Sequence, residues 1–303
     1  MQKNESYNQI TFRGIRWLLL FVFYLQFLIP IVLDWKWKKF FAFPIPDYVQ
    51  MTVIQVFAVL VPCLVFVYLN SASFFEVFKL KKISASYGVM CVLIGVTAQS
   101  VATILNVPVL MLISLKTGGI PEKVVQTPES IIGLLTGLVV VALLPAFFEE
   151  LLMRGIVLSA TEEKGYRASL IISGLYFAII HNQIENFAGH FFLGFLLCYI
   201  VWMTQSVWGG IIAHFSFNAF GMIFDYLMNS TEEATASGDA FYWIVTAILS
   251  LLFFFFVSTI NRKRIRRNKS HKLAVQLLFS ILNFPVLLIV LGYILFQMVR
   301  FSF

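Results

Sequence analysis

Apolar residues along this chain are gathered in nine runs, which short polar stretches separate. The runs lie near 15–33, 51–69, 87–115, 131–158, 168–182, 187–204, 207–228, 240–260 and 275–299. Most approach the ~20 residues that an α-helix needs to cross roughly 30 Å of hydrocarbon at 1.5 Å per residue. The pattern therefore predicts an all-α, polytopic membrane protein.

Two features leave the expected number of transmembrane helices at eight or nine. The runs 168–182 and 187–204 are short and close together, so they can be tilted or partly re-entrant. The run 87–115 is long and contains Pro108, a candidate break. No internal repeat or low-complexity linker divides the chain, and residues 1–303 are expected to form a single membrane domain.

The segment 131–228 differs from the rest of the chain, because it carries polar residues inside its apolar helices. The first three and the last two runs carry almost none. Burying ionisable groups in a bilayer costs about 2.5–3.5 kcal/mol each on insertion scales, so they persist where they pair or serve function. We therefore expect the catalytic core in these middle spans.

Composition agrees with a membrane protein: 60% of the residues are hydrophobic and 12% are charged, against roughly half and a quarter in soluble domains. The three cysteines, Cys63, Cys91 and Cys198, lie far apart inside apolar runs. We interpret them as small buried apolar residues, which form neither a disulfide framework nor a zinc site.

The basic residues behind the net charge of +7 flank the apolar runs, as membrane topology requires. We therefore expect the lipid bilayer as a partner and no nucleic acid. The stretch 261–274 holds seven Lys and Arg residues and is expected to be cytoplasmic. Nine spans threaded from there place the N-terminus in the cytoplasm as well.

The first candidate site is the stretch Glu149-Glu150-Leu-Leu-Met-Arg154. Glu150 and Arg154 are four residues apart, so on a helix they share a face and can pair. Glu149 is rotated about the helix axis by about 100° from Glu150 and has no basic partner on its own helix. This favours Glu149 as a general base. The alternative is an interfacial Glu-Glu-Arg cluster at a helix end.

Histidines mark the other candidate sites. His181 ends an apolar run, and His214 and Asn218 lie four apart on one helical face. Together with Glu149 they supply a carboxylate, two imidazoles and an amide, which is a hydrolytic set. Structural or interfacial hydrogen bonding is the alternative for each. For His190, which lies near two glycines, we favour helix packing.

These motifs in order, Glu149-Glu150-xxx-Arg154, Phe177-xxx-His181 and His214-xxx-Asn218, resemble the motif set of the CPBP family of intramembrane proteases. That family comprises CAAX prenyl endopeptidases of the Rce1 type and bacteriocin-processing enzymes. The resemblance identifies 131–228 as a CPBP-like catalytic core within the membrane domain.

The resemblance also implies roles. Glu149 would activate water with the help of His181, while His214 and Asn218 would form an oxyanion hole. Glu150 and Arg154 would orient Glu149. The implied activity is an intramembrane endopeptidase that hydrolyses a peptide bond in a membrane-associated peptide or protein.

Members of this family are also called metalloproteases, and Glu149, His181 and His214 could ligate Zn²⁺ with an open position. However, the chain has no HExxH motif, and the three residues come from separate helices. We therefore favour water activation without a metal or another cofactor.

The CAAX-processing branch often has a second histidine three residues after the first, where this chain has Ile184. We therefore favour the bacterial branch and a bacterial cell membrane. One alternative is a non-catalytic immunity, scaffold or regulatory protein of the same fold. A transporter is disfavoured, because the polar residues gather in one zone rather than along a path.

Overall fold

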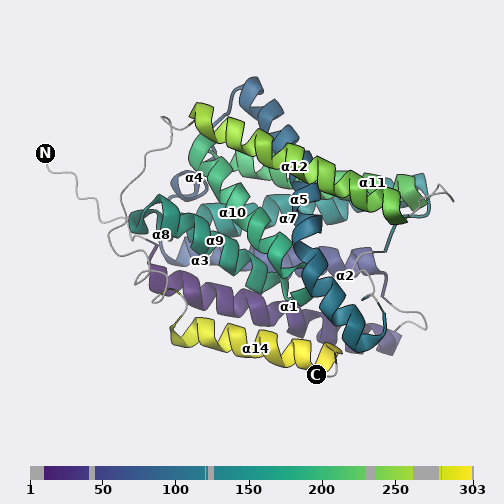
Figure 1. The fold of residues 1–303 in the computed structure, drawn as a ribbon. Helices are drawn as coiled ribbons and strands as arrows, with labels where there is room; N and C mark the ends of the chain where they lie inside the picture. The colour runs from purple at the N-terminus through teal and green to yellow at the C-terminus, as the bar shows by residue number, and fades with distance from the viewer. Residues whose placement is uncertain are drawn as a thin grey trace, which may run out of the picture.

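The computed structural model describes residues 10–40, 45–119, 121, 126–229, 236–261, 280 and 282–301, and the described chain is helical without strands. Figure 1 shows the helices packed as a bundle. The main helical elements in chain order are α1 (Phe12–Phe40), α2 (Asp47–Ile54), η1 (Gln55–Leu60), α3 (Val61–Leu69), α4 (Phe74–Val77), α5 (Ala85–Thr117), α6 (Ile131–Gly137), η2 (Leu138–Leu143), α7 (Leu144–Glu150), η3 (Leu151–Val157), α8 (Leu158–Thr161), η4 (Glu162–Lys164), α9 (Tyr166–His181), η5 (Ile184–Asn186), α10 (Phe187–Thr204), α11 (Val207–Asn229), α12 (Ala236–Ile260) and α14 (Phe284–Phe301).

Eight segments of the described chain are long and apolar enough to cross a membrane. Several of them join consecutive elements, such as Asp47–Leu69 and Ile131–Lys164. The shorter apolar helix α9 follows directly after the second of these. The expected all-α, polytopic fold is confirmed, with eight spans of this length and α9 as a shorter apolar helix beside them.

Helices α9, α10 and α11 form the centre of the bundle. In the span Ile184–Thr204, which contains α10, 67% of the most apolar 18-residue stretch is buried inside the protein. The corresponding share is 17% in the span Tyr242–Ile260 of α12. Helix α10 packs on α9, α5 and α11, whereas α12 packs on α5 and α1 lies beside α14. The polar residues of the middle spans are thus surrounded by protein rather than by lipid.

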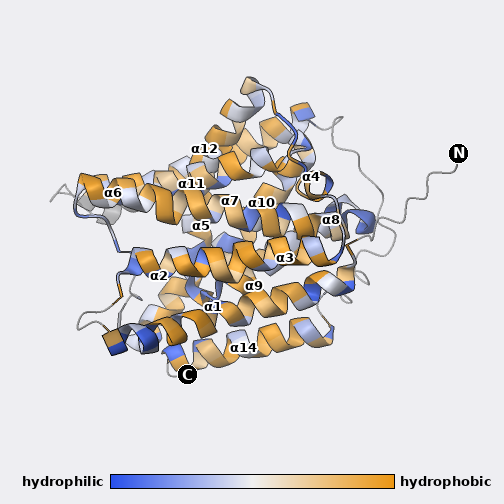
Figure 2. Ribbon diagram, turned by 180° about the vertical axis from the view of Figure 1, so that it is seen from behind, coloured by the Kyte–Doolittle hydropathy of each residue, from blue (hydrophilic) through white to orange (hydrophobic). Residues whose placement is uncertain are grey.

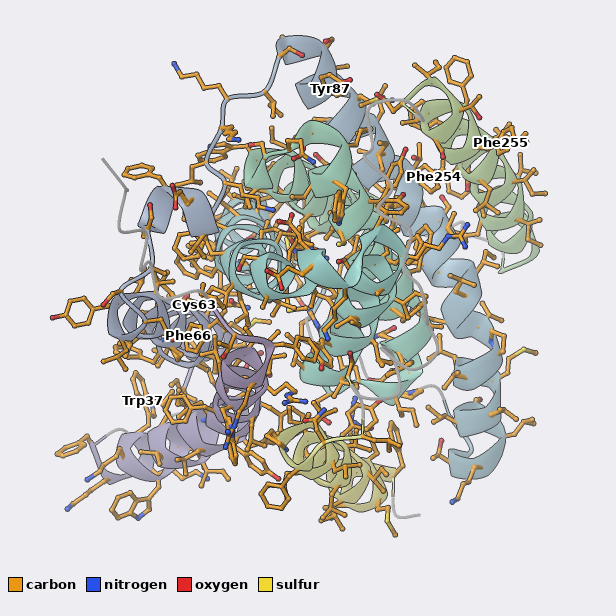
Figure 3. The ribbon with its side chains drawn as sticks, turned by 90° about the vertical axis from the view of Figure 1, so that its left-hand side faces the viewer. Trp37, Cys63, Phe66, Tyr87, Phe254 and Phe255 are labelled. Carbon is orange, nitrogen blue, oxygen red and sulfur yellow. The ribbon has the colours of Figure 1, made fainter. Side chains whose placement is uncertain are left out.

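The outer helices expose large apolar side chains, and Figure 2 shows that α1, α3 and α14 consist mostly of hydrophobic residues. On α12, Phe254 faces inward and packs on Phe192 of α10, with ring centroids 6.1 Å apart. Its neighbour Phe255 is 73% exposed and points away from the bundle in Figure 3. Such faces suit lipid tails, because a bilayer imposes no cost on exposed hydrocarbon.

Some boundaries differ from those expected. Helix α5 continues through Pro108 without a break, which membrane helices tolerate when neighbours surround them. Helix α14 begins at Phe284, where Asn283 Oδ1 accepts a hydrogen bond from Val286 N (3.2 Å) and Pro285 occupies the first turn; the expected start near 275 lies outside the described residues. Residues 262–279 lie outside the described residues, and with them nearly all of the basic stretch 261–274.

The cysteines behave as expected. Cys63, Cys91 and Cys198 are buried and free. Cys63, labelled in Figure 3, belongs to the buried apolar core, where it contributes packing volume.

Candidate active site

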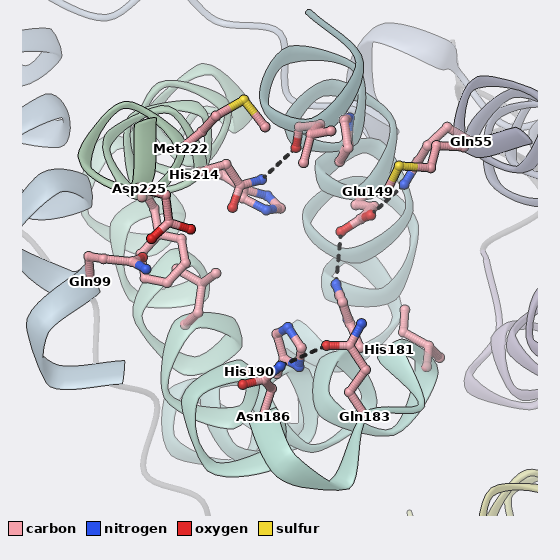
Figure 4. A pocket seen from close by; sticks show the side chains of 18 of the residues that line it. Gln55, Gln99, Glu149, His181, Gln183, Asn186, His190, His214, Met222 and Asp225 are labelled. Carbon is pink, nitrogen blue, oxygen red and sulfur yellow. Dashed lines mark hydrogen bonds and ion pairs between the residues drawn. The ribbon is translucent and has the colours of Figure 1, made fainter. Parts of the chain in front are cut away.

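A cavity of about 610 Å³ opens between the central helices and is lined by all four residues of the expected hydrolytic set. Glu149 comes from α7, His181 from α9, and His214 and Asn218 from α11. Figure 4 shows Glu149 and His181 facing one another across from His214. Three helices that are distant in sequence therefore bring a carboxylate, two imidazoles and an amide to one space.

Pro145 explains how Asn218 is held. A proline has no N–H, so the carbonyl four residues earlier loses its helical donor. That carbonyl belongs to Val141 in the wide-turned segment η2, and it accepts a hydrogen bond from Asn218 Nδ2 at 3.3 Å. This hydrogen bond links η2 to α11, on the N-terminal side of Glu149.

Glu149 is buried, with 7% of its surface exposed. Its Oε1 accepts a hydrogen bond from Gln55 Nε2 at 2.8 Å, and its Oε2 lies 3.4 Å from His181 Nε2. Both partners come from other segments, as expected for a carboxylate without a partner on its own helix. These contacts direct the carboxylate into the cavity.

His181 is fixed by its own helix. Its Nδ1 lies 2.7 Å from the carbonyl of Phe177, and since a carbonyl only accepts, Nδ1 carries the proton and Nε2 faces Glu149. Helix α9 ends directly afterwards, with Asn182 in the left-handed conformation at φ 53°. Gln297 of α14 donates a hydrogen bond to the Asn182 carbonyl at 2.7 Å, so the C-terminal helix steadies this turn.

Glu150 and Arg154 form the expected pair, at 2.7 Å, with both side chains fully buried. Glu150 Oε1 also lies 3.1 Å from His214 Nδ1, so its direct contact in the cavity wall is His214. Arg154 Nη2 donates to the Gly194 carbonyl at 2.9 Å. A Cβ on Gly210 would collide with the Glu150 carboxylate, so glycine there lets α11 approach α7.

His190 also lines the cavity, although the sequence favoured a packing role. Its ring stacks on His181 with centroids 4.2 Å apart and an interplanar angle of 29°. Its Nδ1 is buried and has no hydrogen-bond partner among the described residues. Its position nine residues after His181 gives no helical spacing from which the contact could be predicted.

The fit of a metal ion can be tested on the donor set. Among the described residues, no three His, Cys, Asp or Glu side chains gather closely enough to hold a metal ion. The hydrogen bonds on Nδ1 of His181 and His214 leave Nε2 of each ring open, as in many metal sites, so it is the spacing of the side chains that departs from a zinc site. The residues do not fit a zinc site as they stand.

Comparison with known proteins adds a family to this geometry. Residues 131–220 match the family model for type II CAAX prenyl endopeptidases, Rce1-like. No curated protein matches the chain, and no solved structure matches it. Glu149, His181, His214 and Asn218 all fall inside the matched segment. Residues 131–220 are therefore similar to the Rce1-like family, and the match is consistent with a CPBP-family protease.

Proposed function

We propose that this protein is an intramembrane endopeptidase that hydrolyses a peptide bond in a membrane-associated peptide or protein. One observation carries the proposal: Glu149, His181, His214 and Asn218 line a single cavity within the membrane-spanning bundle. The Rce1-like match supports the same class, because that family is one of proteases.

In the proposed reaction, Glu149 takes a proton from water, and the resulting hydroxide attacks the scissile carbonyl. His181 Nε2 lies beside Glu149 Oε2 and holds the same water in place. The C–N bond then breaks, and the proton passes from Glu149 to the departing amine. Water is consumed and no other reactant is needed.

The opposite wall would stabilise the oxyanion. Since Nδ1 of His214 faces the Glu150 carboxylate, Nε2 is the nitrogen that can donate to the substrate when it carries a proton. Asn218 Nδ2 has one hydrogen on Val141 and a second available for the oxyanion. Removing one such donor typically costs about 10²–10³ in turnover.

Two finer proposals accompany this function. Ile184 stands where CAAX-processing relatives often have a second histidine, which supports the bacterial branch and a bacterial cell membrane. The membrane orientation follows from the basic stretch 261–274, which we propose to be cytoplasmic. With α9 counted as a ninth crossing, the N-terminus is cytoplasmic as well.

The test compares membrane peptides from cells that produce the wild type or Glu149→Gln, which removes the base with almost no change in volume. We expect processed species with the wild type and none with Glu149→Gln. Glu163→Gln is the control and should process as the wild type does, because Glu163 is an exposed carboxylate outside the cavity. Purified His181→Ala should be as inactive as Glu149→Gln.

Normal turnover in well-folded Glu149→Gln would contradict the peptidase function. The protein would then be better described as a non-catalytic immunity, scaffold or regulatory protein of the same fold.

A further inference from the structure

Amide side chains surround the proposed catalytic residues in the cavity. Each amide offers both hydrogen-bond donors and an acceptor. Apart from Asn218, the cavity-lining amides are Gln26, Gln55, Gln99, Gln126, Gln183 and Asn186.

Two of these amides have unmet acceptors. The Oε1 atoms of Gln55 and Gln99 are buried and receive no hydrogen bond from the described residues. Gln55 lies in η1 beside Glu149, and Gln99 lies in α5 on the far side of the cavity, as Figure 4 shows. Buried carbonyl groups without donors are costly, so both walls suit a ligand that brings N–H groups.

The charged residues that line the cavity restrict the charge of a suitable ligand. The lining includes two carboxylates, Glu149 and Asp225, and three imidazoles, and it contains no Lys or Arg. An acidic side chain or a free terminal carboxylate would therefore meet no guanidinium or ammonium group here. A neutral or basic ligand suits the cavity better.

We propose, on the basis of the peptidase function above, that the cavity takes an unlipidated, internal stretch of peptide that is extended and neutral or basic. Its backbone N–H groups donate hydrogen bonds to Oε1 of Gln55 and Oε1 of Gln99, on either side of the scissile bond. Inside a membrane an unwound peptide must find partners for every backbone group, and the amides supply them. A hydrocarbon chain in the same place would leave these acceptors unmet.

Gln99 provides the test, because none of its described hydrogen bonds involves the proposed catalytic residues. Its Nε2 lies against α11 at Gly221, where a Cβ would come within 3.1 Å. Gln99→Leu removes the acceptor, and Gly221→Ala displaces the amide without removing it. Gln50→Leu is the matched control, since Gln50 is on the neighbouring α2 and does not line the cavity.

The purified full-length protein is given a library of internally quenched, unlipidated peptides and a parallel set that carries S-farnesyl cysteine. We expect cleavage of unlipidated members by the wild type, with Asp and Glu depleted around the cleaved bond. An N-methyl group is then moved along the backbone of the best substrate. At one position it should lower kcat/KM by about tenfold, the scale of one hydrogen bond.

The inference is tested by whether the effect of the N-methyl group depends on Gln99. In Gln99→Leu and Gly221→Ala, KM should rise about tenfold, kcat should stay near the wild-type value, and that N-methyl group should cause no further loss. Gln50→Leu should respond as the wild type does. Cleavage restricted to farnesylated peptides, or an equal N-methyl effect in wild type and Gln99→Leu, would overturn this inference and leave the peptidase function standing. If the wild type cleaves neither set, the proposed function fails and this inference with it.

Discussion

His190 lies flat against His181, and the stacked pair limits how the His181 ring can turn. Aromatic pairs of this kind contribute up to about 1.5 kcal/mol, or roughly tenfold. We therefore expect His190→Ala to lower turnover by up to about tenfold, and His190→Phe, which keeps a flat ring, to retain most of it. Turnover per folded molecule is the measurement. Equal losses in both variants would assign the role to the nitrogens of His190 instead of its stacking.

The donor set at Glu149, His181 and His214 leads to a prediction about metals. Because these side chains do not gather into a ligand set, strong chelators should leave the peptidase activity of the purified protein nearly intact. The measurement is cleavage before and after dialysis against a chelator. Loss of activity that added Zn²⁺ restores would instead make Glu149, His181 and His214 metal ligands.

At the residue scale, helical spacing predicts contacts within one helix, whereas the motif set predicts that the four residues of the hydrolytic set meet and predicts no other contact between helices. Four-residue spacing is enough to predict the pair of Glu150 and Arg154. No spacing relates Gln55 to Glu149 or His190 to His181, since those contacts depend on how separate helices pack. A lone glutamine inside the apolar run 51–69 was the available signal for Gln55.

Among the elements, the segment from α7 to η3 concentrates buried charge just behind the cavity lining. Arg154 is fully buried and meets Glu150, the Gly194 carbonyl and the face of Phe177, with its Cζ 4.9 Å from the ring centroid. The guanidinium thus joins α9 and α10 to the helix that carries Glu149.

Glu150→Ala and Arg154→Ala should each lower the amount of folded protein as well as activity. Either change strands the partner's charge inside the bundle, which typically costs about 3–5 kcal/mol. The measurement is folded protein per cell by size-exclusion chromatography in detergent. Glu149→Gln serves as the comparison, because it should lose activity while keeping normal abundance. Normal abundance of Arg154→Ala would contradict the structural role of the pair.

Wide helical turns at η1 and η2 were not predictable from the apolar runs. Each is followed closely by a proline, Pro62 or Pro145, and such widened turns are frequent at functional sites. The runs predict that a helix crosses there, because hydropathy depends on composition. They carry no information on whether the turn is widened by one residue.

For the molecule as a whole, hydropathy predicts the spans well and their arrangement poorly. Gln26, Gln55 and Gln99 come one each from the first three apolar runs, which looked almost free of polar residues, and all three line the cavity. The last helix also reaches the site, since Arg300 pairs with the buried Glu185 at 2.8 Å, just after the turn that follows His181. The site therefore draws on helices well outside the Rce1-like segment.

The orientation of the whole bundle can be tested with single cysteines on either side of α12. Ser270 lies in the basic stretch 261–274 and Thr235 in the acidic stretch before α12, and both positions fall outside the described residues. The native cysteines are buried, so they should give little background. Because seven basic residues resist translocation, Ser270→Cys should react with an impermeant thiol reagent only after the cells are permeabilised, whereas Thr235→Cys should react in intact cells. Ready labelling of Ser270→Cys in intact cells would invert the orientation and put the N-terminus outside, while the fold and the cavity would stand unchanged.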